Sequence, residues 1–375
     1  MKILTPNSVF IAFGLVITLA SCHKDKMAPA TGPATGSKQA TAPGSLYVLS
    51  SGQLNAYTVD TASGQNVPHY SPGSLLNYNF TSKKLIADQY SMANGTPISG
   101  GTNLNIYGSK MYIISLGTIT VVDAKTSKLI KQVNIDNSHN GNFSTRGVAF
   151  YKGNFFLSGN GIVTVYDTST FLVTKTISLG SQVVGDAGLA VANDKLYAAD
   201  SDFQNSMVSV IDLATLTLSN APVYIIPKPI TMAADGNGNV YALSPFDDDA
   251  GNTYGYDGGL SVINSKTNTV SVSQTQGSLN NLTLAAQGNF AYFFNNSNQL
   301  IAFNSTTHTC AVFVTDGTSF IHPKCVAANP ATGEVYVGDS KDKISNGTLY
   351  AFDKTGKLEY TLTTGICPAQ IVVAN

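Results

Sequence analysis

The chain has 375 residues, of which only 11% are charged, and its formal net charge is −1. This balance argues against a nucleic-acid partner, because phosphate neutralisation needs clustered Lys and Arg. The chain contains 34 Gly, 18 Tyr and 17 Phe, no Trp, and a single Arg, Arg146. Such a composition favours strands and tight turns over helices and predicts an all-β protein.

The first 22 residues predict an export signal. Lys2 gives a basic start, residues 9–20 form an apolar run, and Ser21 and Cys22 follow. An apolar run this short indicates a secretory signal rather than a membrane span. Leu-Ala-Ser-Cys at 19–22 resembles the lipobox of bacterial lipoproteins, so Cys22 is the predicted lipidation site. The alternative is an ordinary signal peptide with an incidental Cys.

Residues 23–44 are rich in Ala, Thr, Gly and Pro and show no apolar periodicity. This composition predicts a flexible tether, which as a random coil spans about 25 Å. We therefore divide the chain into a signal (1–22), a tether (23–44) and a folded domain (45–375). A lipidated Cys22 would attach the domain to a membrane surface without spanning it.

One unit recurs seven times from residue 46 onward. Its first half is a strand such as NDKLYAA or NGNVYAL, and its second half is an apolar strand that ends in Asp or Asn before a polar turn. These anchor residues are Asp60, Asp123, Asp167, Asp212, Asn264, Asn304 and Asp353. Their separations are 63, 44, 45, 52, 40 and 49 residues. A period of about 45 with four short strands is typical of a β-propeller blade.

The pattern predicts a seven-bladed β-propeller with four-stranded antiparallel blades. The folded domain begins at a second strand, SLYVLS, and ends with a lone first strand, CPAQIVVAN. The C-terminal strand should therefore pair with the N-terminal blade and close the ring, leaving no long sheet edge exposed. We expect the repeated Asp and Asn residues to cap their own turns rather than to form a catalytic series.

The strand order sorts the loops onto two faces. The first-to-second and third-to-fourth turns share one face and are uniformly short, and we call this the short-turn face. The second-to-third loops and the connections between blades share the other, which we call the loop-rich face. It carries most of the additional length, at 88–103, 135–146, 200–206, 244–259 and 339–347. Because long loops on a rigid scaffold often carry function, we expect binding there.

Four aromatic residues lie in the loops of the loop-rich face: Phe203, Phe246, Tyr254 and Tyr256. Exposing such side chains is costly unless they cover a pocket or meet a partner. They are candidate ligand-binding residues, and the alternative is that they fold back over the channel as a hydrophobic lid.

Three basic residues are further candidates on this face. Arg146 precedes an inner strand and could grip a ligand carboxylate or phosphate, or form a salt bridge to a neighbouring blade. His139 and His322 also reach this face, where a solvated loop His is the plainer interpretation of His139. A hydrolase needs a nucleophile, a base and an orienting acid together. One Arg and two separated His favour a protein without catalysis over a lactonase-type enzyme.

Two further predictions concern metal and sulfur. Asp247 and Asp249 lie in a run of three Asp that could bind Ca²⁺, but the spacing matches an EF-hand poorly and no Glu follows within the loop. Cys325 and Cys367 precede inner strands of adjacent blades, so we predict a disulfide between them.

Three stretches resemble the YncE-like seven-bladed propellers, specifically surface lipoproteins of Bacteroidetes. They are NIYGSKMYIISLGTITVVDAKTSKLIKQ, GVAFYKGNFFLSGNGIVTVYDTSTFLVTKTISLG and VAANPATGEVYVGDSKDKISNGTLYAFDKTGKLEYTLTTG. The resemblance covers about residues 45–375 and implies a lipid-anchored protein of the outer membrane that faces the exterior. One branch of the family captures corrinoids (vitamin B12 and relatives) for a TonB-dependent transporter.

The resemblance makes a corrinoid the most specific ligand candidate and a transporter the candidate partner of an otherwise monomeric protein. A protein-interaction scaffold is the alternative. Two departures weaken the transfer of any binding residue. GSQVVGDAGLA and QGSLNNLTLA replace the Gly-x-x-Pro turn that many relatives carry before inner strands, and Arg and Trp are scarce or absent.

Overall fold

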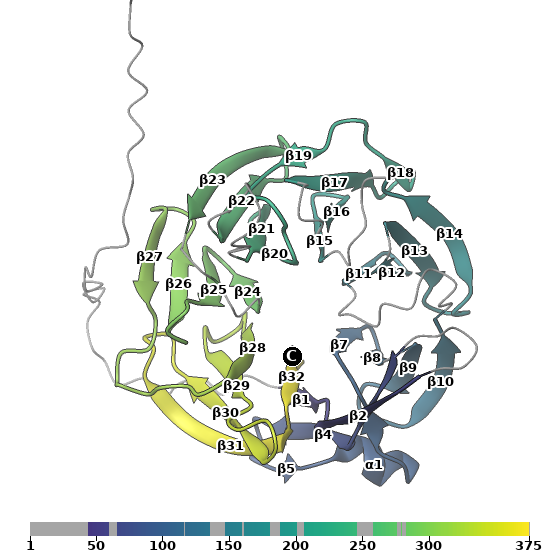
Figure 1. The fold of residues 1–375 in the computed structure, drawn as a ribbon, viewed down its shortest axis with the longest axis vertical. Helices are drawn as coiled ribbons and strands as arrows, with labels where there is room; N and C mark the ends of the chain where they lie inside the picture. Colours follow the sequence, from purple (N-terminus) through teal and green to yellow (C-terminus); the bar gives the residue numbers. More distant parts are fainter. Residues whose placement is uncertain are drawn as a thin grey trace, which may run out of the picture.

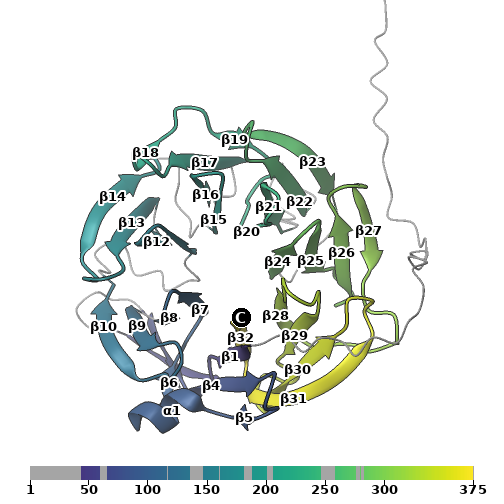
Figure 2. The same cartoon turned by 180° about the vertical axis from the view of Figure 1, so that it is seen from behind.

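The structure is a computed structural model that describes residues 44–59, 66–115, 117–135, 147–159, 161–180, 188–200, 206–245, 258–275, 279 and 283–374. Seven antiparallel sheets stand around a central channel (Figures 1 and 2). The protein is a seven-bladed β-propeller, as the repeats predict. The predicted signal, Cys22 and all of the tether before Gly44 lie outside the described residues. No helix in the described ranges is both long and apolar enough to cross a membrane.

The strands of each blade follow one another from the channel outward. Blade 1 contains β32 (Pro368–Ala374), β1 (Ser45–Ser50), β4 (Pro72–Asn79) and β5 (Leu85–Ile86), with β6 (Ile98–Ser99) beside β4. Blade 2 contains β7 (Asn103–Tyr107), β8 (Lys110–Ser115), β9 (Thr118–Asp123) and β10 (Leu129–Asn134). Blade 3 contains β11 (Val148–Tyr151), β12 (Asn154–Gly159), β13 (Ile162–Asp167) and β14 (Val173–Ser178).

The remaining blades repeat this order. Blade 4 contains β15 (Leu189–Ala192), β16 (Lys195–Ala199), β17 (Met207–Asp212), β18 (Thr217–Leu218) and β19 (Val223–Tyr224). Blade 5 contains β20 (Thr231–Ala234), β21 (Asn239–Ser244), β22 (Gly259–Asn264) and β23 (Thr269–Thr275). Blade 6 contains β24 (Leu284–Gln287), β25 (Phe290–Phe294), β26 (Leu300–Asn304) and β27 (Thr309–Val312). Blade 7 contains β28 (Pro323–Ala328), β29 (Val335–Asp339), β30 (Asn346–Phe352) and β31 (Leu358–Ile366).

The ring closes through the two ends of the folded domain. β32 pairs antiparallel with β1, from Ser45 opposite Ala374 to Leu49 opposite Gln370. β32 thus supplies the inner strand of blade 1, beside the channel (Figure 1). The predicted closure is confirmed, and it removes the long unpaired edge that a ring cut open at this point would expose.

The repeat pattern misplaced one strand of blade 1. Residues 54–59 look like a third strand that ends at Asp60, but β2 (Leu54–Val59) pairs only with β3 (Asn66–Tyr70) in a separate hairpin. The third strand is β4, which ends at Asn79, 44 residues before Asp123. Asn79 is therefore the true anchor of blade 1. The long first separation reflects the inserted hairpin, because a hairpin strand and a blade strand carry the same alternating pattern.

The anchor residues cap their turns. The Asp123 carboxylate accepts the backbone amides of Lys125 at 3.1 Å and Thr126 at 2.7 Å, and Ser127 then adopts a positive φ of 56°. The same contacts recur after Asp167, Asp212, Asn264 and Asn304. The fourth residue after each of these anchors also has a positive φ. The repeated acidic residues therefore shape the short-turn face, as predicted.

The core lies between neighbouring blades. Leu49 and Leu75 of blade 1 pack with Met111 and Ile113 of blade 2 in one buried cluster, and equivalent clusters fill the other interfaces. The six-residue helix α1 (Gln89–Asn94) lies on the outer rim near blades 1 and 2 (Figures 1 and 2). Rigid, mutually packed blades leave the channel and its surrounding loops as the variable part of the molecule.

Candidate functional site

A cavity of about 720 Å³ occupies the channel at the loop-rich face. Residues of all seven inner strands, or the residues just before them, line it. We call this end of the channel the channel mouth, because the lining also includes Asn298 and Lys343 from second-to-third loops. Its volume lies within the range of about 300–1,000 Å³ that is typical of small-molecule sites.

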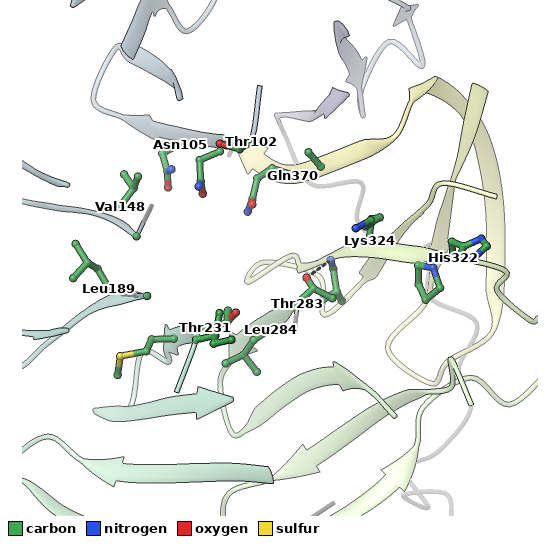
Figure 3. Close-up of a pocket in the computed structure, with 18 of the residues that line it drawn as sticks. Thr102, Asn105, Val148, Leu189, Thr231, Thr283, Leu284, His322, Lys324 and Gln370 are labelled. Carbon is green, nitrogen blue, oxygen red and sulfur yellow. Dashed lines mark hydrogen bonds between the residues drawn. The ribbon is translucent and has the colours of Figure 1, made fainter. Parts of the chain in front are cut away.

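The cavity wall has two chemically different halves. Thr102, Asn105 and Gln370 gather on one side and offer hydroxyl and amide groups, whereas Val148 and Leu189 supply apolar surface beside them (Figure 3). Leu284 extends the apolar half together with the small part of Met232 that is not buried in the blade core, and Thr231 adds a hydroxyl group beside Leu284 (Figure 3). Such a wall suits a molecule that has an apolar body and at least one polar edge.

Lys324 reaches the cavity because of strand alternation. On β28, Cys325 is buried in the core with 2% exposure, while its neighbour Lys324 is exposed and extends toward the cavity (Figure 3). Successive side chains of a strand point to opposite faces, so the buried Cys325 fixes the direction of Lys324.

Asp339 holds the loop that carries His322. Its buried carboxylate accepts the backbone amides of Ile321 at 2.9 Å, His322 at 2.8 Å and Lys341 at 2.9 Å. The His322 ring contacts the Lys341 carbonyl through Nδ1, and Ser340 donates its amide to the His322 carbonyl at 2.9 Å. This bonding fixes the connection between blades 6 and 7 to the β29–β30 loop.

Lys343 is fixed by its backbone on the same side of the mouth. Its amide donates to the Ser340 carbonyl at 2.8 Å, and its own carbonyl lies 3.6 Å from the Cys367 thiol. Burial raises the pKa of Cys367, and the positive charges of Lys324 and Lys343 oppose that rise. The charges of Lys324 and Lys343 therefore both influence the Cys367 thiol, which lies at the channel mouth in the turn between β31 and β32.

Only one of the seven predicted ligand-binding residues lies among the residues that the structure describes. His322 is exposed and lines the cavity. The other six, namely His139, Arg146, Phe203, Phe246, Tyr254 and Tyr256, lie outside the described residues, as do Asp247 and Asp249. Among the residues that the structure does describe, no group of three or more His, Cys, Asp or Glu could hold a metal ion.

The predicted Cys325–Cys367 disulfide is not formed. Both thiols are free, with the Cys325 sulfur 3.6 Å from the Pro368 carbonyl and the Cys367 sulfur 3.6 Å from the Lys343 carbonyl. The prediction placed both residues near the channel but ignored strand alternation, which turns Cys325 into the blade core. Cys367 stays partly exposed at a turn, with a positive φ of 53°.

Sequence reasoning missed Lys324 and Lys343, although a signal for Lys324 exists. Across the seven inner strands that the structure describes, Lys324 is the single charged residue. A charge on a strand that lines a channel is costly unless it faces water or a ligand. No comparable signal marks Lys343, because a Lys in a polar loop is ordinary.

Comparison with known proteins supports the fold. No family model matches the chain, and no curated protein does. A quinonprotein alcohol dehydrogenase-like protein from Bacteroides thetaiotaomicron aligns at a TM-score of 0.58 with 17% identity, covering 86% of this chain and 78% of that one. Kuenenia stuttgartiensis hydrazine synthase also gives 0.58 at 14% identity, over 72% and 88% of the two chains. The computationally designed protein Ika8 gives 0.53 at 14%, over 85% and 89%. At these identities the similarity concerns the propeller architecture alone.

Proposed function

We propose that this protein is a non-catalytic binding protein that holds a small-molecule ligand at the channel mouth. The observation that carries the proposal is the cavity of about 720 Å³, which has a polar half and an apolar half. Its described lining contains His322, which could act as a general base, but no Asp or Glu that could orient it and no Cys nucleophile. The concentration of long loops around the same end of the ring supports the proposal as well.

We further propose that the protein belongs with the YncE-like lipoproteins and is anchored through Cys22 on the outer surface of the outer membrane. The support is the apolar run at 9–20, the residues Leu-Ala-Ser-Cys at 19–22 and the likeness of the blade sequences. A corrinoid is the most specific ligand candidate, for delivery to an outer-membrane transporter. A molecule of that size would cover the mouth and insert only one edge into the cavity.

A protein-interaction scaffold is the second candidate function. Ile321 and Ile344 are 60% and 62% exposed, and they flank the cavity residues His322 and Lys343. Exposed large apolar side chains beside a pocket are typical of surfaces that meet another protein. A transporter that accepts the ligand would use this surface together with the cavity.

A thermal-shift screen tests the binding proposal. The full chain is heated with cobalamin and with a library of amphipathic small molecules, alongside Val148→Trp, which fills the apolar side of the cavity. We expect at least one compound to raise the Tm of the wild type but not that of Val148→Trp. If no compound raises the Tm at high micromolar concentration, or if Val148→Trp responds equally, the channel mouth is not the binding site.

A further inference from the structure

The channel mouth carries positive charge that the described part of the protein does not neutralise. Lys324 and Lys343 both line the cavity and are exposed. The ion pair found among the described residues is Lys152–Asp194, which lies between first-to-second turns on the short-turn face. Neither lysine of the mouth is paired with a described carboxylate.

The carboxylates of Asp339 and Asp342, at the β29–β30 loop that carries Lys343, are occupied by backbone amides. Asp339 is fully buried and accepts three amides, as described above. Asp342 accepts the amides of Ile344 at 3.0 Å and Ser345 at 2.7 Å, and the Ser345 hydroxyl at 2.9 Å. These donors hold the pKa of Asp342 at about 2, so it stays ionised as a loop cap. Its negative charge balances at most one of the two lysines.

Lys324 lies across the cavity from Val148 and Leu189, which offer an apolar surface that is unsuited to simple inorganic ions (Figure 3). Val148 and Leu284 expose part of their apolar surface in the same cavity, and Leu189 and Met232, which are mostly buried in the blade cores, add a smaller part. An inorganic anion would leave that apolar surface in contact with water, whereas an organic anion would cover it. Burying apolar surface contributes about 25 cal/mol per Å², and low-dielectric walls strengthen the attraction between a bound anion and nearby cations.

We infer that the ligand of the channel mouth is an amphipathic organic anion, whose carboxylate or phosphate contacts Lys324 and Lys343 and whose apolar body covers the Val148–Leu189 side. The inference rests on the proposed binding function and narrows its chemistry. Thr102, Asn105 and Gln370 hydrogen-bond the remaining polar atoms of the ligand. A neutral compound of equal size would leave the two ammonium groups without an ion-pair partner among the described residues.

A matched set of probes separates charge from apolar contact. Isothermal titration of the full chain with decyl phosphate, decanoate, decanamide and inorganic phosphate compares two anionic amphiphiles with a neutral one and with the bare ion. We expect both anionic amphiphiles to bind at least about tenfold more tightly than decanamide or inorganic phosphate, because a hydrogen bond to a charged group adds roughly one tenfold factor or more. The preference should shrink as NaCl is raised, because salt screens exposed charges.

Three variants test which lysines contact the anionic group of the ligand. Lys324→Gln and Lys343→Gln should each weaken decyl phosphate binding about tenfold while leaving decanamide binding unchanged. Lys341→Gln is the matched control, because Lys341 lies in the same loop but not in the cavity lining, and it should bind as the wild type does. Equal Tm values for the three variants show that folding is intact.

The outcomes separate this inference from the proposed function. If decanamide binds as tightly as decyl phosphate, and neither lysine variant changes the affinity for decyl phosphate, the ligand is not recognised through its negative charge. The proposal that the channel mouth binds a small molecule would still stand. If inorganic phosphate binds as tightly as decyl phosphate, the apolar wall has no part in recognition, and the amphipathic class is wrong. If none of the probes binds, the inference fails, and the broad screen above decides separately whether the mouth binds anything.

Discussion

The buried carboxylate of Asp339 accepts the backbone amide of His322 at 2.8 Å and thereby ties the β29–β30 loop to the connection that enters blade 7. The same carboxylate accepts the amides of Ile321 and Lys341. One buried side chain thus fixes the backbone just before Lys324 and just before Lys343, the two residues that carry positive charge at the channel mouth.

Asp339→Ala should lower the free energy of unfolding by about 2–4 kcal/mol, because three backbone amides lose their one buried acceptor. Asp339→Asn should cost less, since its remaining oxygen still accepts amides while its NH₂ group faces one of them. Urea denaturation measures both. Asp342→Ala, which removes an exposed cap of the same loop, is the control and should cost less than about 1 kcal/mol. Equal effects at the two positions would contradict the role of Asp339.

Gly356 lies in the third-to-fourth turn of blade 7 with a φ of +79°, and a Cβ there would come within 1.8 Å of the Phe313 carbonyl oxygen. We expect Gly356→Ala to lower the free energy of unfolding by about 3 kcal/mol or more, from strain and clash together. Gly153→Ala has a similar φ of +82° but open space around the Cβ, so it should cost only about 1–2 kcal/mol. An equal loss of stability in both variants would show that backbone strain alone, without the clash at Gly356, causes the destabilisation.

Glu359 makes stability depend on pH near neutrality. Its side chain is exposed on the outer strand β31, but partial desolvation raises its pKa from 4.5 to about 7, and the hydrogen bond and charge of Glu334 add to this rise. The folded protein keeps the proton between these two values while the unfolded chain releases it, so stability should decrease as pH rises from about 4.5 to about 7. Thermal melts across this range should show a falling Tm, and Glu359→Gln should flatten the curve. An unchanged slope in Glu359→Gln would rule out this residue as the source.

The turn-capping Asp residues should make stability depend on pH in a more acidic range. Hydrogen bonds from Ser169 and Thr170 lower the pKa of Asp167, and Thr126 does the same for Asp123. A lowered pKa stabilises the fold above the ordinary value of 3.8, and this contribution is lost as pH falls below it. Asp167→Asn should fold, because Asn264 and Asn304 make the same turn, and it should lose less stability on acidification to pH 2.5 than the wild type. Acid denaturation followed by circular dichroism tests this directly.

Sequence periodicity was sufficient to predict the blade count, the strand order and the ring closure, because each blade repeats one pattern of alternating apolar residues and one capped turn. It failed at β2, because an inserted hairpin has the same alternation, and only pairing partners distinguish it from a blade strand. The turn signal at Asn79 was available, since Ser82 follows it at the usual spacing and donates both its amide and its hydroxyl.

The site was harder to predict than the fold. His322 was chosen for its residue type and does line the cavity, whereas Lys324 was overlooked because PKCVAA resembles any inner strand apart from its charge. Lys343 reaches the cavity through a loop whose path depends on the buried Asp339 and on the turn at Cys367. Contacts between loops of different blades of this kind leave no periodic trace in the sequence.

Peptide-resolved alkylation of Cys367 tests most directly whether the channel mouth binds the ligand. Cys367 is partly exposed beside Lys343, while Cys310 on the outer strand β27 is also partly exposed but far from the lining in the strand order, so it serves as the internal control. A ligand that raises the Tm should slow alkylation of Cys367 by iodoacetamide at least about fivefold and leave Cys310 unchanged. Unaltered labelling of Cys367 at saturating ligand would show that the ligand does not cover the Lys343 side of the channel mouth and would contradict the proposed site.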